Sequence, residues 1–452
     1  MMNDYKNLIW EISTRLRNVT FSRDYVLSTL RILFLKYSID NCIGAVTADD
    51  MQACVKAQKM FALRDTANGI DAVIPVLEYL DRAYGLDHIL SGAETIEAYG
   101  RDLFGFDASR KKRNASDKSF QMLLEYIGGL DLEENTSLPL GQALADAILS
   151  EMTSASMRNS LYGEYVTPHS VSKFAKELLR VRSDDTFVDF ASGIGSSSLV
   201  ICGDAKPRIM NAEINRVNAA SAAMLYILYG FKSIHVVCAD SLSDPIPDLC
   251  GNKLFVEPPF SAKLTRSETS KYSDSSLAAL SGIIDNYLTK PGDAVMVCQG
   301  SLLFQSRPQT VSLRERLIEG GMLRAVITLP ALTSYSTGIT VHLLVIGKAD
   351  TIAQSDVLFI DLAREMKGNR YRNAQRDGII PDELIEKVIS CVDDPMVIPG
   401  FSCVVSCDSI RENQYNLVPA SYLPPEDEED DITIDEINEQ LKDLYELLLQ
   451  NQ

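Results

Sequence analysis

The chain has 452 residues, enough for two to four domains, and an apolar fraction of 46% that is ordinary for a protein with a buried core. Its 62 acidic residues outnumber its 43 basic ones, and the formal charge of −19 argues against a free-standing nucleic-acid binder. Contact with nucleic acid would need local basic patches or a partner that supplies them. The densest basic cluster, Arg110-Lys111-Lys112-Arg113, is compatible with a solvated loop or with a phosphate contact.

The apolar runs, cysteines and histidines of the sequence indicate where the protein is located and whether it binds a metal. No apolar run reaches the length of a membrane span, and the amphipathic start, MMNDYKNLIWEISTRL, lacks the apolar core of a signal peptide. The nine cysteines are scattered without a C-x-x-C pair, which is typical of buried free thiols. We therefore expect a cytoplasmic protein with no membrane segment. Because the four histidines are dispersed, we expect no metal site.

Residues 1–155 are predicted to form a helical domain. Apolar residues recur there at three- and four-residue spacing in the segments 8–19, 25–41, 71–86 and 140–155, and strand-like runs are nearly absent.

The pattern then changes to short apolar strands that alternate with helices, within a predicted domain over 156–423. The expected strands are 186–191, 208–214, 234–240, 253–260, 293–300, 323–330 and 340–348. This alternation predicts an α/β fold with a mainly parallel, doubly wound sheet. Ligands on such sheets bind at the carboxyl ends of the strands.

Residues 424–452 are predicted to form an acidic linker and a tail helix. Apolar residues follow a heptad pattern at Ile434, Ile437, Leu441, Leu444 and Leu448. A helix this short needs a partner surface, which the rest of this chain or another chain could supply.

Four successive predicted strands end in acidic residues, namely Asp189, Glu213, Asp240 and Glu257. The first strand runs into ASGIGSSS, whose glycines Gly193 and Gly195 allow the backbone to approach a ligand closely. A carboxylate in the position of Glu213 can accept hydrogen bonds from both hydroxyls of a ribose, and Asp240 can accept one from an exocyclic amine. The loop lacks the third glycine of a dinucleotide site and the lysine of a P-loop, so we expect a nucleoside with no pyrophosphate.

The fourth strand ends in FVEPPF, which places a carboxylate, a rigid turn and an aromatic ring together at residues 257–260. The alternatives are a loop with an incidental Glu257 and a pocket that grips a planar, polar base.

In its ordered set of motifs, the chain resembles the N6-adenine DNA methyltransferases, specifically the modification subunits of type I restriction–modification enzymes. The resemblance rests on LIWEISTRLRN, GEYVTPHSV, VDFASGIGSSS, NAEINRVNAASAAMLYILYG, ADSLSDP, LRAVITLPALTSYSTGITVHLLVIGK and NQYNLVPASYL, which run nearly end to end. It implies a Rossmann-like fold that uses S-adenosylmethionine, with a helical amino-terminal domain and a helical carboxyl-terminal tail.

The resemblance also implies roles for individual residues. The cofactor site would contain Glu164, Tyr165, Val166, Thr167, Pro168, His169, Asp189, Gly193, Ile194, Gly195, Ser196, Glu213 and Asp240. The target-base site would contain Glu257, Pro258, Pro259 and Phe260, with the ring stacked on an adenine flipped out of the duplex.

Glu257 departs from the family pattern, which has asparagine at this position. A carboxylate can accept a hydrogen bond from the adenine amine, but glutamate is one methylene longer, and a misplacement of about 1 Å can cost roughly a hundredfold in rate. The second hypothesis is therefore a catalytically impaired subunit that serves as a scaffold or binds the cofactor. A third is a methyltransferase for protein amides, against which the helical domain and tail argue.

The resemblance implies DNA as substrate and a specificity subunit that chooses the sequence. It also allows for a restriction subunit and for a second copy of this chain in the complex.

Overall fold

The computed structural model describes residues 2–17, 25–64, 69–104, 106–107, 112–113, 117–133, 139–158, 167–260, 264, 272, 274–331, 340–349, 356–367, 371, 373–374 and 379–423. The predicted tail over 424–452 lies outside these residues, as do Arg110 and Lys111 of the basic cluster. The rest of that cluster forms β2 (Lys112–Arg113), which pairs antiparallel with β1 (Phe106–Asp107).

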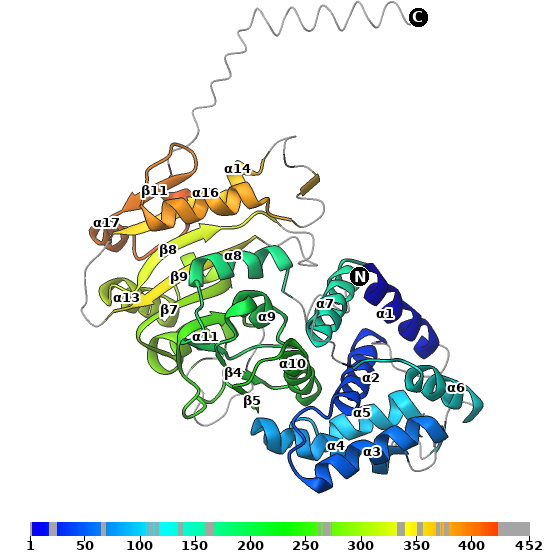
Figure 1. Ribbon diagram of the computed structural model, residues 1–452. Coiled ribbons are helices and arrows are strands. Elements are labelled where there is room, and N and C mark those ends of the chain that lie inside the picture. Colours follow the sequence, from blue (N-terminus) through cyan, green and yellow to red (C-terminus); the bar gives the residue numbers. More distant parts are fainter. Residues whose placement is uncertain are drawn as a thin grey trace, which may run out of the picture.

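The amino-terminal part of the chain is helical, as predicted, and is drawn from blue to cyan in Figure 1. Its helices are α1 (Met2–Arg17), α2 (Tyr25–Asp40), α3 (Ala48–Leu63), α4 (Gly69–Tyr84), α5 (Ala93–Phe104), α6 (Asp117–Gly128) and α7 (Leu140–Arg158). The four predicted segments correspond to α1, α2, α4 and α7, whereas α3, α5 and α6 were not predicted.

Helix α3 illustrates how the local sequence forms these elements. Thr47 and Asp50 form a capping box, in which the side chain of each accepts from the backbone N–H of the other. Ala53, Ala57 and Phe61 then recur every fourth residue on the buried face.

The second part of the chain forms a nine-stranded mixed sheet with the order β11-β10-β8-β9-β7-β6-β3-β4-β5. Its strands are β3 (Thr186–Asp189), β4 (Arg208–Glu213), β5 (Ile234–Cys238), β6 (Gly251–Val256), β7 (Leu288–Gln299), β8 (Leu323–Thr328), β9 (Val341–Lys348), β10 (Val357–Asp361) and β11 (Ser402–Val405). Strands β7, β6, β3, β4 and β5 run parallel, and β9 runs antiparallel to both of its neighbours. All seven predicted strands are confirmed; β10 and β11 were not predicted.

Helices cover both faces of this sheet. One face packs against α8 (His169–Leu179), α9 (Ser196–Cys202), α10 (Arg216–Tyr229) and α16 (Asp382–Asp393). The other packs against α11 (Ser275–Gly282), α13 (Pro308–Glu319) and α17 (Cys407–Glu412). The short helices α12 (Gly300–Phe304) and α14 (Leu362–Glu365) follow the carboxyl ends of β7 and β10. No helix in the described part of the chain is long and apolar enough to cross a bilayer.

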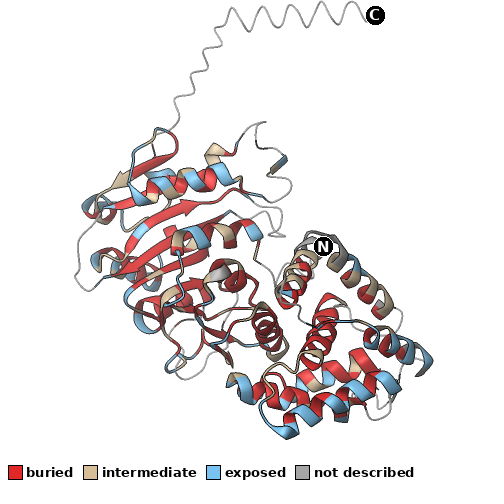
Figure 2. Ribbon diagram, in the orientation of Figure 1, coloured by how far each residue is buried: buried red, intermediate tan, exposed pale blue. Residues whose placement is uncertain are grey.

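Helix α10 joins the two parts of the molecule. It contacts β4 and β5 on one side and α2, α5 and α7 on the other, as Figure 1 also shows. Residues 218–228 are therefore buried around the whole circumference of the helix, in contrast to the exposed outer faces of α3 and α4 in Figure 2. A helix that is apolar all round is expected where both sides are covered. The helical part thus shares one continuous apolar core with the sheet.

Candidate cofactor and target-base site

The four acidic strand ends of the sequence analysis lie side by side at one edge of the sheet. Strands β6, β3, β4 and β5 are consecutive neighbours and all parallel, so Glu257, Asp189, Glu213 and Asp240 follow one another along their carboxyl edge. From β3 the chain crosses to β4 on one side, whereas β6 lies on the other. This is a topological switch point, where open α/β sheets bind ligands.

The glycine loop between β3 and α9 is shaped by close packing. Gly195 has φ +76°, and a Cβ added there would lie 2.3 Å from the hydroxyl oxygen of Tyr226, which is buried. Gly193 also has a positive φ, of +54°. Only glycine adopts such a conformation without strain, so the loop can bring its backbone N–H groups close to the strand ends. Ile194 and Ser196, the other loop residues of the predicted cofactor site, are buried.

Glu213 ties this loop to the end of β4. Its Oε2 accepts from the backbone N–H of Gly193 at 2.9 Å, and its Oε1 accepts from that of Asn215 at 2.8 Å. Burial raises the pKa of Glu213, while these two backbone hydrogen bonds and the side chain of Asn218 oppose the rise. The carboxylate is half-buried at the edge, where its remaining lone pairs can accept from ligand hydroxyls.

Asp189 is held further inside and is only 2% exposed. It accepts from the backbone N–H of Ala191 and from the hydroxyl of Ser198, each at 3.2 Å. Burial raises the pKa of Asp189 to about 7, and the charges of Glu257 and Glu213 add to the rise against these hydrogen bonds. Both hydrogen bonds tie Asp189 to the glycine loop and to α9, and its contact with the cofactor stays a prediction.

Asp240 lies at the end of β5 and organises the turn that follows it. Its Oδ1 accepts from the backbone N–H groups of Leu242 and Ser243 at 3.2 and 3.1 Å. The neighbouring Ser241 donates to the carbonyl of Phe190, and the hydroxyl of Tyr287 donates to the carbonyl of Ser241 at 2.8 Å. These bonds fix the end of β5 relative to β3.

Glu257 directly follows β6 and faces the segment before α8 that contacts the helix after the glycine loop. Its Oε2 accepts from the hydroxyl of Thr167 at 2.5 Å, so the carboxylate is directed towards the segment that precedes α8. Pro258 is buried, whereas Pro259 is exposed and its carbonyl accepts from the hydroxyl of Ser275 at 2.6 Å. Phe260 is half-buried.

The predicted segment before the sheet is described only in part. Glu164, Tyr165 and Val166 lie outside the described residues. Thr167 and Pro168 lead into α8, whose first residue, His169, is exposed.

A nucleoside with a cationic tail fits the donors and acceptors of this edge. Ribose hydroxyls and an exocyclic amine are hydrogen-bond donors, and Glu213 and Asp240 present acceptors at adjacent strand ends. Ile214, directly after Glu213, is 67% exposed and offers an apolar surface for a base. Among the described residues, no group of three or more His, Cys, Asp and Glu side chains could hold a metal ion.

Comparisons with known proteins agree with this geometry. The family model N-6 DNA Methylase matches residues 144–431. The chain belongs to the N-6 DNA methylase family. Membership confirms the resemblance to the N6-adenine methyltransferases, the Rossmann-like α/β fold and S-adenosylmethionine as the methyl donor.

The relatives of this N-6 DNA methylase are of the type I class. It is 24% identical to the type I restriction enzyme MjaVIII methylase subunit of Methanocaldococcus jannaschii, over 79% of this chain and 72% of that protein. It is 26% identical to the MpnII methylase subunit of Mycoplasma pneumoniae, over 62% of this chain and 58% of that protein. The fold is similar to that of a type I methyltransferase subunit from Streptococcus thermophilus, with a TM-score of 0.72, 19% identity, and coverage of 94% of this chain and 99% of that chain.

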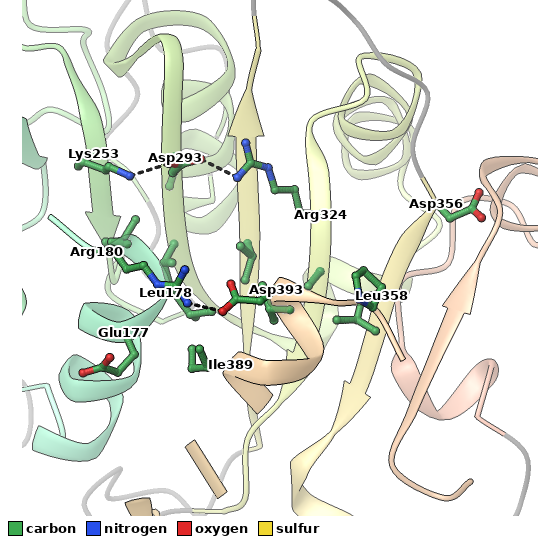
Figure 3. A pocket seen from close by; sticks show the side chains of 17 residues that line it. Glu177, Leu178, Arg180, Lys253, Asp293, Arg324, Asp356, Leu358, Ile389 and Asp393 are labelled. Atoms are coloured by element: carbon green, nitrogen blue, oxygen red, sulfur yellow. Dashed lines mark hydrogen bonds and ion pairs between the residues drawn. The ribbon is translucent and has the colours of Figure 1, made fainter. Parts of the chain in front are cut away.

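A groove of about 530 Å³ opens at the opposite, amino edge of the sheet, between α8 and α16 (Figure 3). Five of its charged side chains form ion pairs with one another. Asp293 binds Lys253 and Arg324, each at 2.7 Å, and Asp393 binds Arg180 at 2.5 Å. Because this groove is remote from the glycine loop and the acidic strand ends, it is not part of the candidate site.

Sequence reasoning missed the residues that support the site from other elements. Ser197, Ser198, Tyr226 and Ser275 contact the loop, Thr167 or the Pro-Pro turn through side chains that carry no motif of their own. The sequence offered a signal for Ser197 and Ser198, because the serine run after Gly195 lies at a predicted helix start. It also offered one for Ile214, an apolar residue next to a predicted ribose acceptor.

Proposed function

We propose that this chain is the methylase subunit of a type I restriction–modification enzyme, and that it transfers a methyl group from S-adenosylmethionine to N6 of an adenine in DNA. The observation that carries the proposal is the position of the Glu-Pro-Pro-Phe turn. It ends β6, directly beside the strand that leads into the glycine loop of an N-6 DNA methylase. The groups that we propose for the target base and for the cofactor therefore lie at one switch point.

Bound S-adenosylmethionine supplies an electrophilic methyl group. In the proposed site, Glu213 accepts from the ribose hydroxyls, Asp240 accepts from the adenine amine of the cofactor, and the glycine loop closes over the nucleoside. We propose that the segment 164–169, of which the structure describes residues 167–169, binds the methionine part. The sulfonium and ammonium groups carry positive charge, which the acidic edge favours.

The chain's own groups then activate the target. The exocyclic amine of adenine is a poor nucleophile because its lone pair is delocalised into the ring. In the proposed mechanism, the Glu257 carboxylate and the Pro258 carbonyl accept its two hydrogens, which localises the lone pair and aims it at the methyl group. Phe260 stacks on the flipped base. The ring is half-buried and directly follows the exposed Pro259.

The net charge of −19 supports a division of labour in which a specificity subunit supplies the DNA contacts that read sequence. A second copy of this chain and a restriction subunit complete the proposed assembly. We also propose the domain limits 1–155, 156–423 and 424–452, with the tail as a docking helix and the cytoplasm as the location.

The competing proposal is a scaffold that binds cofactor but does not transfer methyl groups. Glu257 favours it, because the side chain is longer than the asparagine of the family pattern. The two proposals differ in one measurement, the N6-methyladenine content of DNA.

The test is mass spectrometry of DNA from cells that express this chain with its specificity partner. The native chain is run beside Glu257→Asn, and beside Glu257→Ala, which removes the acceptor. We expect N6-methyladenine from the native chain and none from Glu257→Ala. Methylation by Glu257→Asn but not by the native chain would support the scaffold proposal. If neither chain methylates adenine while both still bind S-adenosylmethionine, the proposed methyl transfer is refuted.

A further inference from the structure

A chain of two hydroxyl groups leads from the glycine-loop helix to the proposed catalytic carboxylate. The Ser197 hydroxyl donates to Thr167 Oγ1 at 2.5 Å, and the Thr167 hydroxyl donates to Glu257 Oε2 at 2.5 Å. Both protons are thus directed towards the carboxylate. Hydrogen bonds in such a series polarise one another, and a bond to an ionised acceptor is short and strong.

The three residues come from three separate elements. Ser197 lies in the first turn of α9 and is 3% exposed, so the far end of the chain is anchored in the core. Thr167 is followed by the buried Pro168, which precedes α8, and α8 packs against α9. Glu257 directly follows the central strand β6. The donor is therefore held at a defined place relative to the carboxylate.

A fixed donor restricts the rotational freedom of the glutamate side chain. Its carboxylate rotates broadly about the last torsion, and the extra methylene adds a further rotatable bond relative to asparagine. An acceptor that aligns an amine for attack must be placed to within a fraction of an ångström. A hydrogen bond that holds Oε2 also fixes the carboxylate plane, and with it the position of Oε1.

On the basis of the function proposed above, we propose that Thr167, itself held by Ser197, is a positioning residue for the Glu257 carboxylate in methyl transfer. Thr167 acts through Glu257 rather than on the target base. Thr167 and Glu257 together place an acceptor of defined direction at the end of β6, although glutamate is longer than the asparagine of the family pattern.

A double-mutant cycle tests this role in the complex with the specificity partner. Thr167→Val keeps the shape of the side chain but removes the donor, and we expect kcat to fall roughly ten- to a hundredfold. Thr167→Ser keeps the donor and should restore kcat to within about threefold of the native value. In a Glu257→Asn or Glu257→Asp background the shorter side chain loses the contact. At saturating S-adenosylmethionine, Thr167→Val should therefore lower kcat by a factor several times smaller there than in the native background.

Two further measurements separate this role from cofactor binding and from folding. Calorimetry gives the Kd for S-adenosylmethionine of each variant, and we expect the kcat loss of Thr167→Val to exceed any change in Kd. Ser197→Ala removes the second donor and should lower kcat in the same direction, by less. If neither Glu257→Asn nor Glu257→Asp transfers methyl groups, the positioning role is tested by the kcat of Thr167→Val against that of Thr167→Ser in the native background.

The inference is overturned if Thr167→Val lowers kcat equally in the native and short-acceptor backgrounds, or if Thr167→Val leaves the native kcat unchanged. In either case methyl transfer itself continues, so the proposed function stands. If neither the native chain nor any Glu257 variant methylates adenine while S-adenosylmethionine still binds, the proposed function fails and the positioning role fails with it.

Discussion

The carboxylates around the groove at the amino edge of the sheet and those at the ends of β3, β4 and β5 have different hydrogen-bond partners. At the amino edge, Asp293 is paired with Lys253 and Arg324, and Asp393 is paired with Arg180 (Figure 3). At the carboxyl edge, Asp189, Glu213 and Asp240 accept from backbone N–H groups and from a hydroxyl.

The type of hydrogen-bond partner decides whether a carboxylate remains available to a ligand. A cation cancels the charge of a carboxylate, whereas a neutral donor orients the carboxylate and leaves its charge in place. The carboxyl edge therefore offers the oriented acceptors of Glu213 and Asp240 to a ligand that brings donors and positive charge. The amino edge has a groove of about 530 Å³, but five of its charged side chains are already paired with one another.

The largest expected effect contrasts two glycines, one at each edge. In Gly195→Ala the new Cβ meets the buried Tyr226 hydroxyl at 2.3 Å in a backbone with φ +76°, and we expect a loss of about 2–4 kcal/mol of unfolding free energy. In Gly347→Ala the Cβ meets the guanidinium of Arg324, whose half-exposed side chain can move away, and we expect a loss below about 1 kcal/mol. Urea denaturation measures both. Equal losses would contradict the tighter packing of the carboxyl edge.

The next effect concerns ligand affinity. Glu213→Ala should weaken S-adenosylmethionine binding by about a hundredfold, because charge-assisted hydrogen bonds to the ribose are lost. The matched control at the amino edge is Asp293→Ala, which breaks two ion pairs and should leave the Kd unchanged. Calorimetry measures both. An unchanged Kd in Glu213→Ala would refute the ribose assignment, and a weaker Kd in Asp293→Ala would place the ligand at the wrong edge.

The smallest effect is a pH dependence that originates in Asp189. The pKa of Asp189 is about 7 in the folded chain, above the usual value near 4. Between about pH 4 and pH 7, Asp189 therefore carries a proton in the folded state that it lacks in the unfolded state. Stability from this group is therefore complete at low pH and is lost as the pH rises from about 4 to 7. Between pH 5 and pH 7 the native chain should lose about 2 kcal/mol more than Asp189→Asn. Parallel pH profiles of the two chains by urea denaturation would contradict a proton on Asp189.

Much of the fold was accessible from sequence because the pattern of apolar residues differs between helices and strands. Seven strands of the large sheet were predicted, since each is an apolar run of suitable length between turns. Strands β10 and β11 were missed although they are no shorter than the predicted strands β5 and β3, so their length does not explain the difference. Helices α5 and α6 were missed although their apolar stripes are as clear as that of α4. Helix α3 has a weaker stripe, and its capping box, Thr47 and Asp50, was the local signal that could have marked its start.

The sequence by itself determined the chemistry at the strand ends: four carboxylates, a glycine loop and a Pro-Pro-aromatic turn, each encoded within a few adjacent residues. The tertiary structure alone decided which strands are neighbours, and hence that β6 lies beside β3 and that the four carboxylates share one edge. It also decided that Thr167 and Ser197, 90 and 60 residues away in the chain, reach Glu257 through two hydrogen bonds. Local sequence sets turns and periodicity, but contacts between distant residues depend on how the strands are ordered and the helices pack, which no local pattern specifies.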